Sequence, residues 1–501
     1  MNAPTTHLLA LALIAALTPE GASAAQVDSV TRHTLTLNGN VMAYVARAGT
    51  ITLYNKNFRP TADIFFTAYT KEGVDPAHRP ITFFYNGGPG GSSVWQRMAA
   101  FGPVRVLASK PGETLSAPYR VAENQYSLLD KTDEVYIDAP ATGFSRILPA
   151  GKPSDFFGVD EDAAAFAQFI TRYLSKYGRW NSPRYLFGES YGTIRSAAIV
   201  RLMQGGFGQA TQFNGVVLMS TVLNTNLLWD DENIGGNDWP FVLFLPTEAA
   251  TAWFHERVPR HQQFADFLGT VERFALTEYL TTLAQGDDAP ASMRDDVVHK
   301  LHDYIGLPED FIRSSNLRIA PGRFRSELLR GQGKVVGYMD TRYTGYDPVG
   351  NRTEPLWDNS DLAATPAIVS IFNDYVRKQL GYATDLQYRS LYDVETQWSW
   401  KHETDLGGTA ALIQSPNTIV DLSEAMAENP GMHVFAALGY YDMSTPYFEA
   451  EYDFTHLHLP QALRSNLTIE RYQSGHMIYI DPGSLAKLKT DLARWYDAGK
   501  P

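Results

Sequence analysis

The sequence predicts an α/β fold with a doubly wound, mostly parallel sheet and a large helical insertion. Short strand-like runs alternate with segments of helical periodicity, as at 134–137, 160–176 and 215–219. Such alternation is typical of a sheet covered by helices on both faces. Between 222 and 424 the pattern changes, and helical segments follow one another with proline, glycine and tryptophan between them. That change predicts an insertion into the sheet domain.

The chain should divide into three regions. Residues 1–24 resemble a secretory leader, because a ten-residue apolar run, Leu8 to Leu17, precedes a small-residue cleavage pattern at 22–24. Residues 25–221 and 425–501 should form the sheet domain, which begins with alternating, antiparallel strands. Residues 222–424 should form a mostly helical cap. We expect a secreted or periplasmic protein, without membrane insertion because the apolar run is too short to span a bilayer.

Composition excludes several classes of protein. The chain of 501 residues has a formal charge of −13, which argues against a nucleic-acid partner. It has no cysteine, so neither a disulfide framework nor a thiolate metal site is possible. We expect no metal and no cofactor. The sequence does not indicate the oligomeric state.

A candidate nucleophile lies in the segment 185–193. It reads as a strand, then Gly188-Glu189-Ser190-Tyr191-Gly192, then a helix. The G-x-S-x-G pattern at a strand-to-helix turn holds a serine clear of its neighbours, because glycines leave room around the sharp turn. Ser190 is therefore the predicted nucleophile.

A serine nucleophile needs a base, and the base needs an acid that orients it. Asp442 lies in the turn that ends the apolar segment 433–442, and His476 lies in the Gly-His that ends the alternating segment 467–477. Both come just after the carboxyl end of a predicted strand, where open α/β sheets build their sites. Asp138, which also follows a strand, is a rival for the acid.

Acyl transfer also needs donors for the oxyanion. The strand 81–85 leads into the glycine-rich run Asn86-Gly87-Gly88-Pro89-Gly90-Gly91, whose backbone N–H groups could approach a substrate closely. The alternatives are a simple tight turn or a phosphate cradle. A phosphate loop would need a lysine or a following GK[ST], and the run has neither.

Five ordered strings resemble the signature segments of the serine carboxypeptidase family in its bacterial form. They are NGGPGGSS, IDAPATGFS, GESYGT, GYYDMSTPYFEAEY and SGHMIYID. The resemblance implies an α/β-hydrolase fold and a peptidase that releases carboxyl-terminal residues through an acyl-enzyme. It implies Ser190 as nucleophile, His476 as base and Asp442 as orienting acid.

The same resemblance implies roles for four further residues. The backbone N–H groups of Gly88 and Tyr191 would form the oxyanion hole. Asn86 and Glu189 would bind the terminal carboxylate of a peptide substrate. The alternative for Glu189 is a buried hydrogen-bonded pair without a role in recognition.

The sequence departs from the family at the segment 96–102. The family has a second carboxylate-binding glutamate there, whereas this chain has no acid. Arg97 could pair with the substrate instead, although we expect a solvated side chain. The loss predicts a looser demand for a free carboxylate and a weaker preference for acid pH. It leaves open an esterase or amidase of relaxed specificity and an acyltransferase, while a non-catalytic peptide binder conflicts with the intact triad.

Overall fold

A ten-stranded sheet forms the centre of the molecule. The structure is a computed structural model that describes residues 28–107, 110–111, 113, 115–204, 211–228, 236–405 and 410–499. The strands lie in the order β1-β2-β3-β7-β4-β9-β10-β15-β16, and β8 pairs with Ala62 and Asp63 near the start of β3. The bounds are β1 Ser29–Leu37, β2 Asn40–Tyr54, β3 Pro60–Lys71, β4 Ile81–Tyr85, β7 Asp133–Ile137, β8 Arg146–Ile147, β9 Arg184–Glu189, β10 Gly215–Met219, β15 His433–Gly439 and β16 Leu467–Tyr472.

The sheet has an antiparallel part and a parallel part. Strands β1, β2, β3 and β7 pair antiparallel, and every pair from β7 through β4, β9, β10 and β15 to β16 is parallel. The predicted α/β class and mostly parallel sheet are therefore confirmed. Because the strands from β7 to β16 are parallel, their carboxyl ends meet at one edge, and the segments that follow them lie close together.

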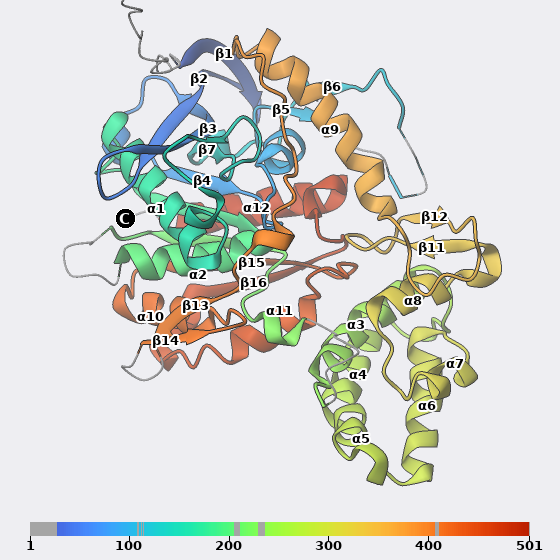
Figure 1. Ribbon diagram of the computed structural model, residues 1–501. Helices are drawn as coiled ribbons and strands as arrows, with labels where there is room; N and C mark the ends of the chain where they lie inside the picture. Colours follow the sequence, from blue (N-terminus) through green and yellow to red (C-terminus); the bar gives the residue numbers. More distant parts are fainter. Residues whose placement is uncertain are drawn as a thin grey trace, which may run out of the picture.

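Helices cover both faces of the sheet and create two hydrophobic cores. Alternate residues of β9 point to opposite faces, so Leu186 joins one core while Tyr185 and Phe187 join the other. The first core is shared with α1 and α2, and the second with α12 (Figure 1). The helices of the sheet domain are α1 Val159–Lys176, α2 Tyr191–Gln204, α10 Ile419–Glu428, α11 Tyr447–Thr455 and α12 Pro482–Ala498.

Helices dominate the chain between β10 and β15. In Figure 1, α3 to α8 form a lobe beside the sheet domain, and α9 runs back along that domain. Their bounds are α3 Trp239–Phe254, α4 Phe264–Phe274, α5 Leu280–Ala284, α6 Ala291–Ile305, α7 Glu309–Ser314, α8 Pro321–Glu327 and α9 Asn359–Lys378. Two hairpins accompany them, β11 Lys334–Val336 with β12 Thr344–Tyr346 and β13 His402–Asp405 with β14 Ala410–Ile413. The role of this region as a cap stays a prediction.

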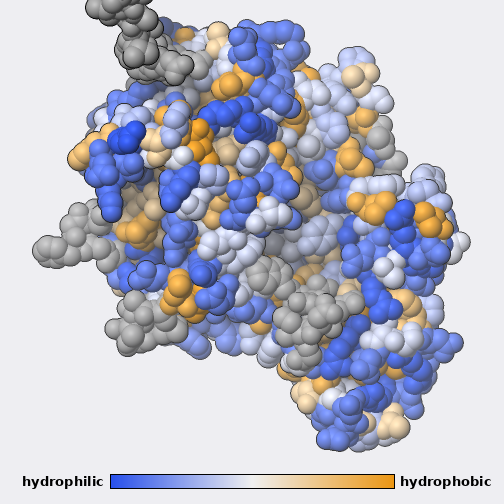
Figure 2. Space-filling model, in the orientation of Figure 1, coloured by the Kyte–Doolittle hydropathy of each residue, from blue (hydrophilic) through white to orange (hydrophobic). Residues whose placement is uncertain are grey.

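The surface on the face shown in Figure 2 is mainly hydrophilic, and its hydrophobic residues form small separate patches.

A third pair of short strands, β5 Val104–Val106 and β6 Val121–Glu123, lies near α9. Within the described residues, a helix long and apolar enough to cross a membrane is absent. The predicted leader, residues 1–24, lies outside the described residues.

Candidate active site

Ser190 occupies a strained turn between β9 and α2. Its φ is +62°, a left-handed conformation that non-glycine residues seldom adopt. Its N–H donates to the carbonyl oxygen of Met219 at the end of β10, 3.0 Å away. A Cβ on Gly188 would lie 2.1 Å from the carbonyl oxygen of Gly192, so a larger residue could not occupy position 188. The G-x-S-x-G pattern therefore lies in the strand–turn–helix setting that it requires.

Asp442 and His476 form a buried hydrogen-bonded pair. The Nδ1 atom of His476 lies 2.8 Å from Oδ2 of Asp442, and the two residues are 3% and 0% exposed. The other carboxylate oxygen of Asp442 accepts from the backbone N–H groups of Ser444 and Thr445 at 2.9 and 3.0 Å. With Nδ1 on the carboxylate, a neutral His476 has its proton acceptor at Nε2.

Ser220 connects this pair to the nucleophile turn. Its hydroxyl donates to the carbonyl oxygen of His476 at 2.5 Å, and its carbonyl accepts from the Thr445 hydroxyl at 3.0 Å. The preceding residue, Met219, accepts the hydrogen bond from Ser190. The loops that carry Ser190, Asp442 and His476 therefore meet around the end of β10.

The pKa of His476 is raised above its ordinary value. Burial by itself would lower the pKa, but the charge and hydrogen bond of Asp442 outweigh burial, and the charge of Glu189 adds to them. An imidazolium formed when His476 takes a proton is therefore stabilised, as a general base requires.

The glycine-rich loop passes directly against the nucleophile turn. A Cβ on Gly87 would lie 2.5 Å from the backbone nitrogen of Tyr191 and 2.9 Å from the Cβ of Ser190. Gly88 follows with a φ of +111°, and Gly91 donates to the carbonyl oxygen of Gly87 at 2.9 Å. The absence of side chains lets the loop backbone approach Ser190.

Asn86 and Glu189 belong to one buried polar cluster. The amide of Asn86 donates to Oε2 of Glu189 at 2.6 Å, and the Tyr479 hydroxyl lies 3.0 and 3.1 Å from the two carboxylate oxygens. Gln96, also buried, donates its backbone N–H to the side-chain oxygen of Asn86 at 3.4 Å. Burial raises the pKa of Glu189 to about 7, although the charge of His476 and hydrogen bonds from Tyr479 and Gln96 act in the opposite direction.

Arg97 is not solvated, so that prediction is wrong, and its side chain bonds to residues outside this cluster. Its side chain is completely buried, with Nη1 donating to the Thr67 hydroxyl at 2.9 Å and Nη2 to the Tyr388 hydroxyl at 3.0 Å. The guanidinium also lies 3.6 Å from the centre of the Phe372 ring. These partners are far from Arg97 in sequence, so its local pattern gave no sign of its burial.

Sequence reasoning missed three residues of the site. Thr445 holds Asp442 through its backbone and its hydroxyl, Tyr479 binds Glu189, and Gln96 binds Asn86. Tyr479 lies three residues after His476 and Thr445 three residues after Asp442, so proximity in the chain was an available signal. Asp138, the rival acid, instead binds Ser93.

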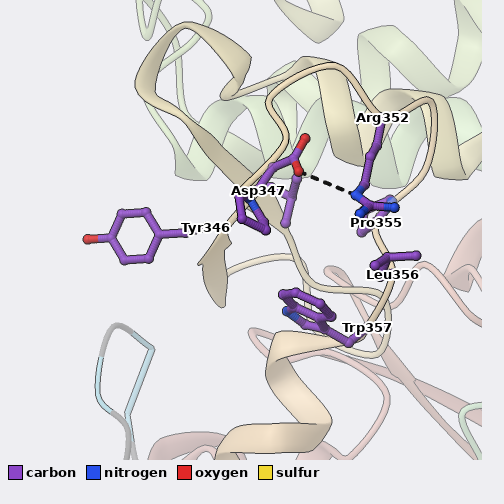
Figure 3. Close-up of a pocket in the computed structure, with 8 residues that line it drawn as sticks. Tyr346, Asp347, Arg352, Pro355, Leu356 and Trp357 are labelled. Carbon is purple, nitrogen blue, oxygen red and sulfur yellow. Dashed lines mark ion pairs between the residues drawn. The ribbon is translucent and has the colours of Figure 1, made fainter.

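A small pocket lies apart from these residues, next to β12. Its volume is about 10 Å³, enough for about one water molecule, and its lining includes the ion pair of Asp347 with Arg352 (Figure 3). It is too small for a peptide side chain.

Across the part of the chain that the structure describes, no group of three or more His, Cys, Asp or Glu residues could hold a metal ion.

The serine in its strained strand-to-helix turn, the histidine–carboxylate pair and the strand order of the sheet are together those of an α/β-hydrolase. A sequence model of the serine carboxypeptidase family matches residues 48–230. Serine carboxypeptidase-like 33 of Arabidopsis thaliana is 30% identical over 155 residues, which are 30% of this chain and 30% of that protein. Serine carboxypeptidase 1 of Hordeum vulgare is 28% identical over 158 residues, also 30% of each chain.

The fold is similar to that of a solved structure over most of the chain. The crystal structure of Kex1, a prohormone-processing carboxypeptidase from Saccharomyces cerevisiae, has a TM-score of 0.53 and 16% identity, with 90% of this chain and 91% of that chain covered. The predicted α/β-hydrolase fold and the resemblance to serine carboxypeptidases are confirmed. The matches to the curated relatives span only about a third of their length. The bacterial form of the family stays a prediction.

Proposed function

We propose that this protein is a serine-type carboxypeptidase that releases carboxyl-terminal residues from peptides through an acyl-enzyme. The observation that carries the proposal is the buried pair of His476 and Asp442, joined through Ser220 and Met219 to Ser190 in its strained turn. A serine in that position, with a base whose protonated form is stabilised, is equipped for nucleophilic attack on a carbonyl carbon.

The proposed reaction has two halves. The hydroxyl oxygen of Ser190 attacks the carbonyl carbon of the last peptide bond, while His476 takes the hydroxyl proton at Nε2. The backbone N–H groups of Gly88 and Tyr191 stabilise the oxyanion. His476 then gives its proton to the leaving amine. Water, activated by the same histidine, hydrolyses the acyl-enzyme and regenerates Ser190.

Asn86 and Glu189 are proposed to bind the terminal carboxylate of the substrate. A carboxylate cannot accept a hydrogen bond from another carboxylate, so Glu189 must be protonated to serve. A pKa raised to about 7, primarily by burial, keeps it protonated in weakly acidic solution. Recognition should therefore persist closer to neutral pH than in a site where two acids share one proton.

Two extensions of the proposal concern specificity and location. Because the segment 96–102 has no acid, esters and amides could also be accepted, and an alcohol could intercept the acyl-enzyme in an acyltransfer reaction. Product analysis with and without acceptor alcohols distinguishes hydrolysis from transfer. Secretion or periplasmic export, proposed from residues 1–24, predicts a mature protein that lacks them, which amino-terminal sequencing would detect.

A fluorophosphonate probe tests the central proposal. It should label the folded protein once, at Ser190, and Ser190→Ala should abolish both labelling and release of the last residue from a peptide. Ser326→Ala provides a control at another buried serine, in α8 of the helical lobe. Labelling at a serine other than Ser190, or peptide capture without any turnover, would contradict the proposal.

A further inference from the structure

The glycine-rich loop is held on two sides. One side packs on the nucleophile turn, and the other pairs with residues 388–392, a segment that we call the strap. Ser92 donates its N–H to the carbonyl oxygen of Ser390, and Tyr392 donates to that of Gly90, both at 2.9 Å. A Cβ on Gly90 would lie 2.3 Å from the carbonyl oxygen of Tyr392, so the contact is close.

The strap is itself fixed at its beginning. Arg389 exchanges two backbone hydrogen bonds with Gly143, 2.7 and 3.1 Å long. Gly143 belongs to the loop after β7 that also contains Asp138, and Asp138 accepts from both the backbone and the hydroxyl of Ser93, at 2.9 and 2.7 Å. Strap, glycine-rich loop and Asp138 loop therefore form one hydrogen-bonded unit beside Ser190.

Arg97 contacts this unit through the strap. It lies on a π-helical turn, Gln96–Ala100, directly after the glycine-rich loop, and its guanidinium binds Thr67 of β3 and Tyr388 of the strap. Such turns occur frequently at functional sites. Burial by itself would lower the pKa of Arg97, but Tyr388 and the negative charge of Asp138 outweigh it, so the side chain stays a cation.

A buried cation is costly for stability, because a well-packed apolar side chain of similar size is often as stable or more stable. What a guanidinium offers instead is geometry, since its planar fork fixes two acceptors at once. Here the two acceptors are the hydroxyl groups of Thr67 on β3 and Tyr388 on the strap, 321 residues apart in the sequence.

We infer that Arg97 is a positioning residue for the oxyanion hole: through Tyr388 it holds the strap against Gly90 and Ser92 and so fixes the backbone N–H of Gly88. The inference rests on the proposed function, because it assigns Arg97 a role in that same reaction. Arg97 touches neither the substrate nor the reacting atoms. It acts through the strap and the loop.

Tyr388→Phe tests the inference with the loss of one oxygen atom. Complete removal of an oxyanion donor lowers kcat by about 100- to 1,000-fold, so a displaced donor should lower kcat by about tenfold. KM for a peptide should stay within about twofold, because the carboxylate-binding residues are unchanged. The inhibition constant of a peptide boronic acid, whose adduct places an oxygen in the oxyanion hole, should rise by the same factor as kcat falls.

Tyr279→Phe is the matched control. It also removes a buried tyrosine hydroxyl, which donates to the carbonyl oxygen of Leu317 at 2.6 Å in the helical lobe. It should leave kcat and the boronic-acid constant unchanged. If Tyr388→Phe does not fold, Arg97→Lys decides, because one ammonium cannot reproduce the fork, and the same fall in kcat is expected.

A folded Tyr388→Phe with unchanged kcat and boronic-acid affinity would overturn the inference, as would equal effects of Tyr388→Phe and Tyr279→Phe. These results differ from failure of the proposed function, in which the unmodified protein neither takes the fluorophosphonate label at Ser190 nor cleaves a peptide. Faster amide hydrogen exchange over 87–93 in Tyr388→Phe, with unchanged exchange in the lobe, would support it further.

Discussion

Glu189 should make the preference for a free carboxyl terminus depend on pH. Its pKa is raised to about 7, primarily by burial. Below pH 7 the protonated carboxyl can donate a hydrogen bond to the terminal carboxylate of a peptide. Above pH 7 the ionised form has no proton to donate and repels that carboxylate. A peptide amide carries no terminal charge and is exempt from this repulsion.

The size of the effect follows from electrostatics and titration. Two unit charges about 4 Å apart repel by roughly 4 kcal/mol at an effective dielectric constant of about 20. That exceeds the roughly 2.7 kcal/mol that corresponds to a factor of 100. The titration of Glu189 therefore limits the size of the effect. The preference for a free carboxyl terminus over the amide should fall about tenfold for each pH unit above 7, so that it is about 100-fold lower at pH 9.

The assay is the ratio of kcat/KM for a peptide to kcat/KM for its amide, from pH 5 to 9. The ratio isolates Glu189, because ionisation of His476 affects both substrates equally and cancels. Glu189→Gln should give a ratio independent of pH. Glu134→Gln is the control, since Glu134 is equally buried, with a pKa raised to about 8, but lies near the amino end of β7.

Three results would refute this reasoning. The first is a ratio that does not change with pH in the unmodified protein. The second is a fall in the ratio that persists in Glu189→Gln, and the third is a change in the ratio caused by Glu134→Gln. A ratio near one at every pH would also remove the carboxypeptidase assignment while leaving the serine hydrolase chemistry intact.

Two further predictions concern stability. The imidazole of His402 lies 2.6 Å from Asp160 and 3.0 Å from Asp421. Burial would lower the pKa of His402, but these two hydrogen bonds and the carboxylate charges raise it to about 9. The stability that His402 contributes to the folded protein is therefore complete below pH 6.5 and is lost as the pH rises through 9. His402→Gln should lower the free energy of unfolding by about 2–4 kcal/mol at pH 6 and by less at pH 10, measured by urea denaturation. Burial raises the pKa of Asp453 to about 7, and the pKa of its neighbour Glu449 is also raised. Because a raised pKa means that the folded state disfavours the ionised form, the free energy of unfolding should fall as the pH rises from 4 to 8. Asp453→Asn should flatten that pH dependence, and an unchanged slope would contradict the explanation.

Local pattern was sufficient for the architecture around the nucleophile. The alternating run before 70 and the apolar runs from 81 onward are short-range signals, and they correspond to the antiparallel and parallel parts of the sheet. The polar residues after β9, β15 and β16 could be predicted to converge because parallel strands end at one edge. A proline does not mark the start of α9, because Pro366 lies inside the helix and Asp358 caps its start by accepting the backbone N–H of Ser360.

The sequence by itself determined which residues could be nucleophile, acid and base, because each follows the carboxyl end of a predicted strand. Only the tertiary structure decided how they are supported. Arg97 is buried because Thr67 and Tyr388 meet it from distant parts of the chain, and Tyr479 joins Glu189 from a segment 290 residues away. Periodicity reports which face of one element is buried. It contains no information about partners that approach from other elements, and those partners set burial, charge and pKa.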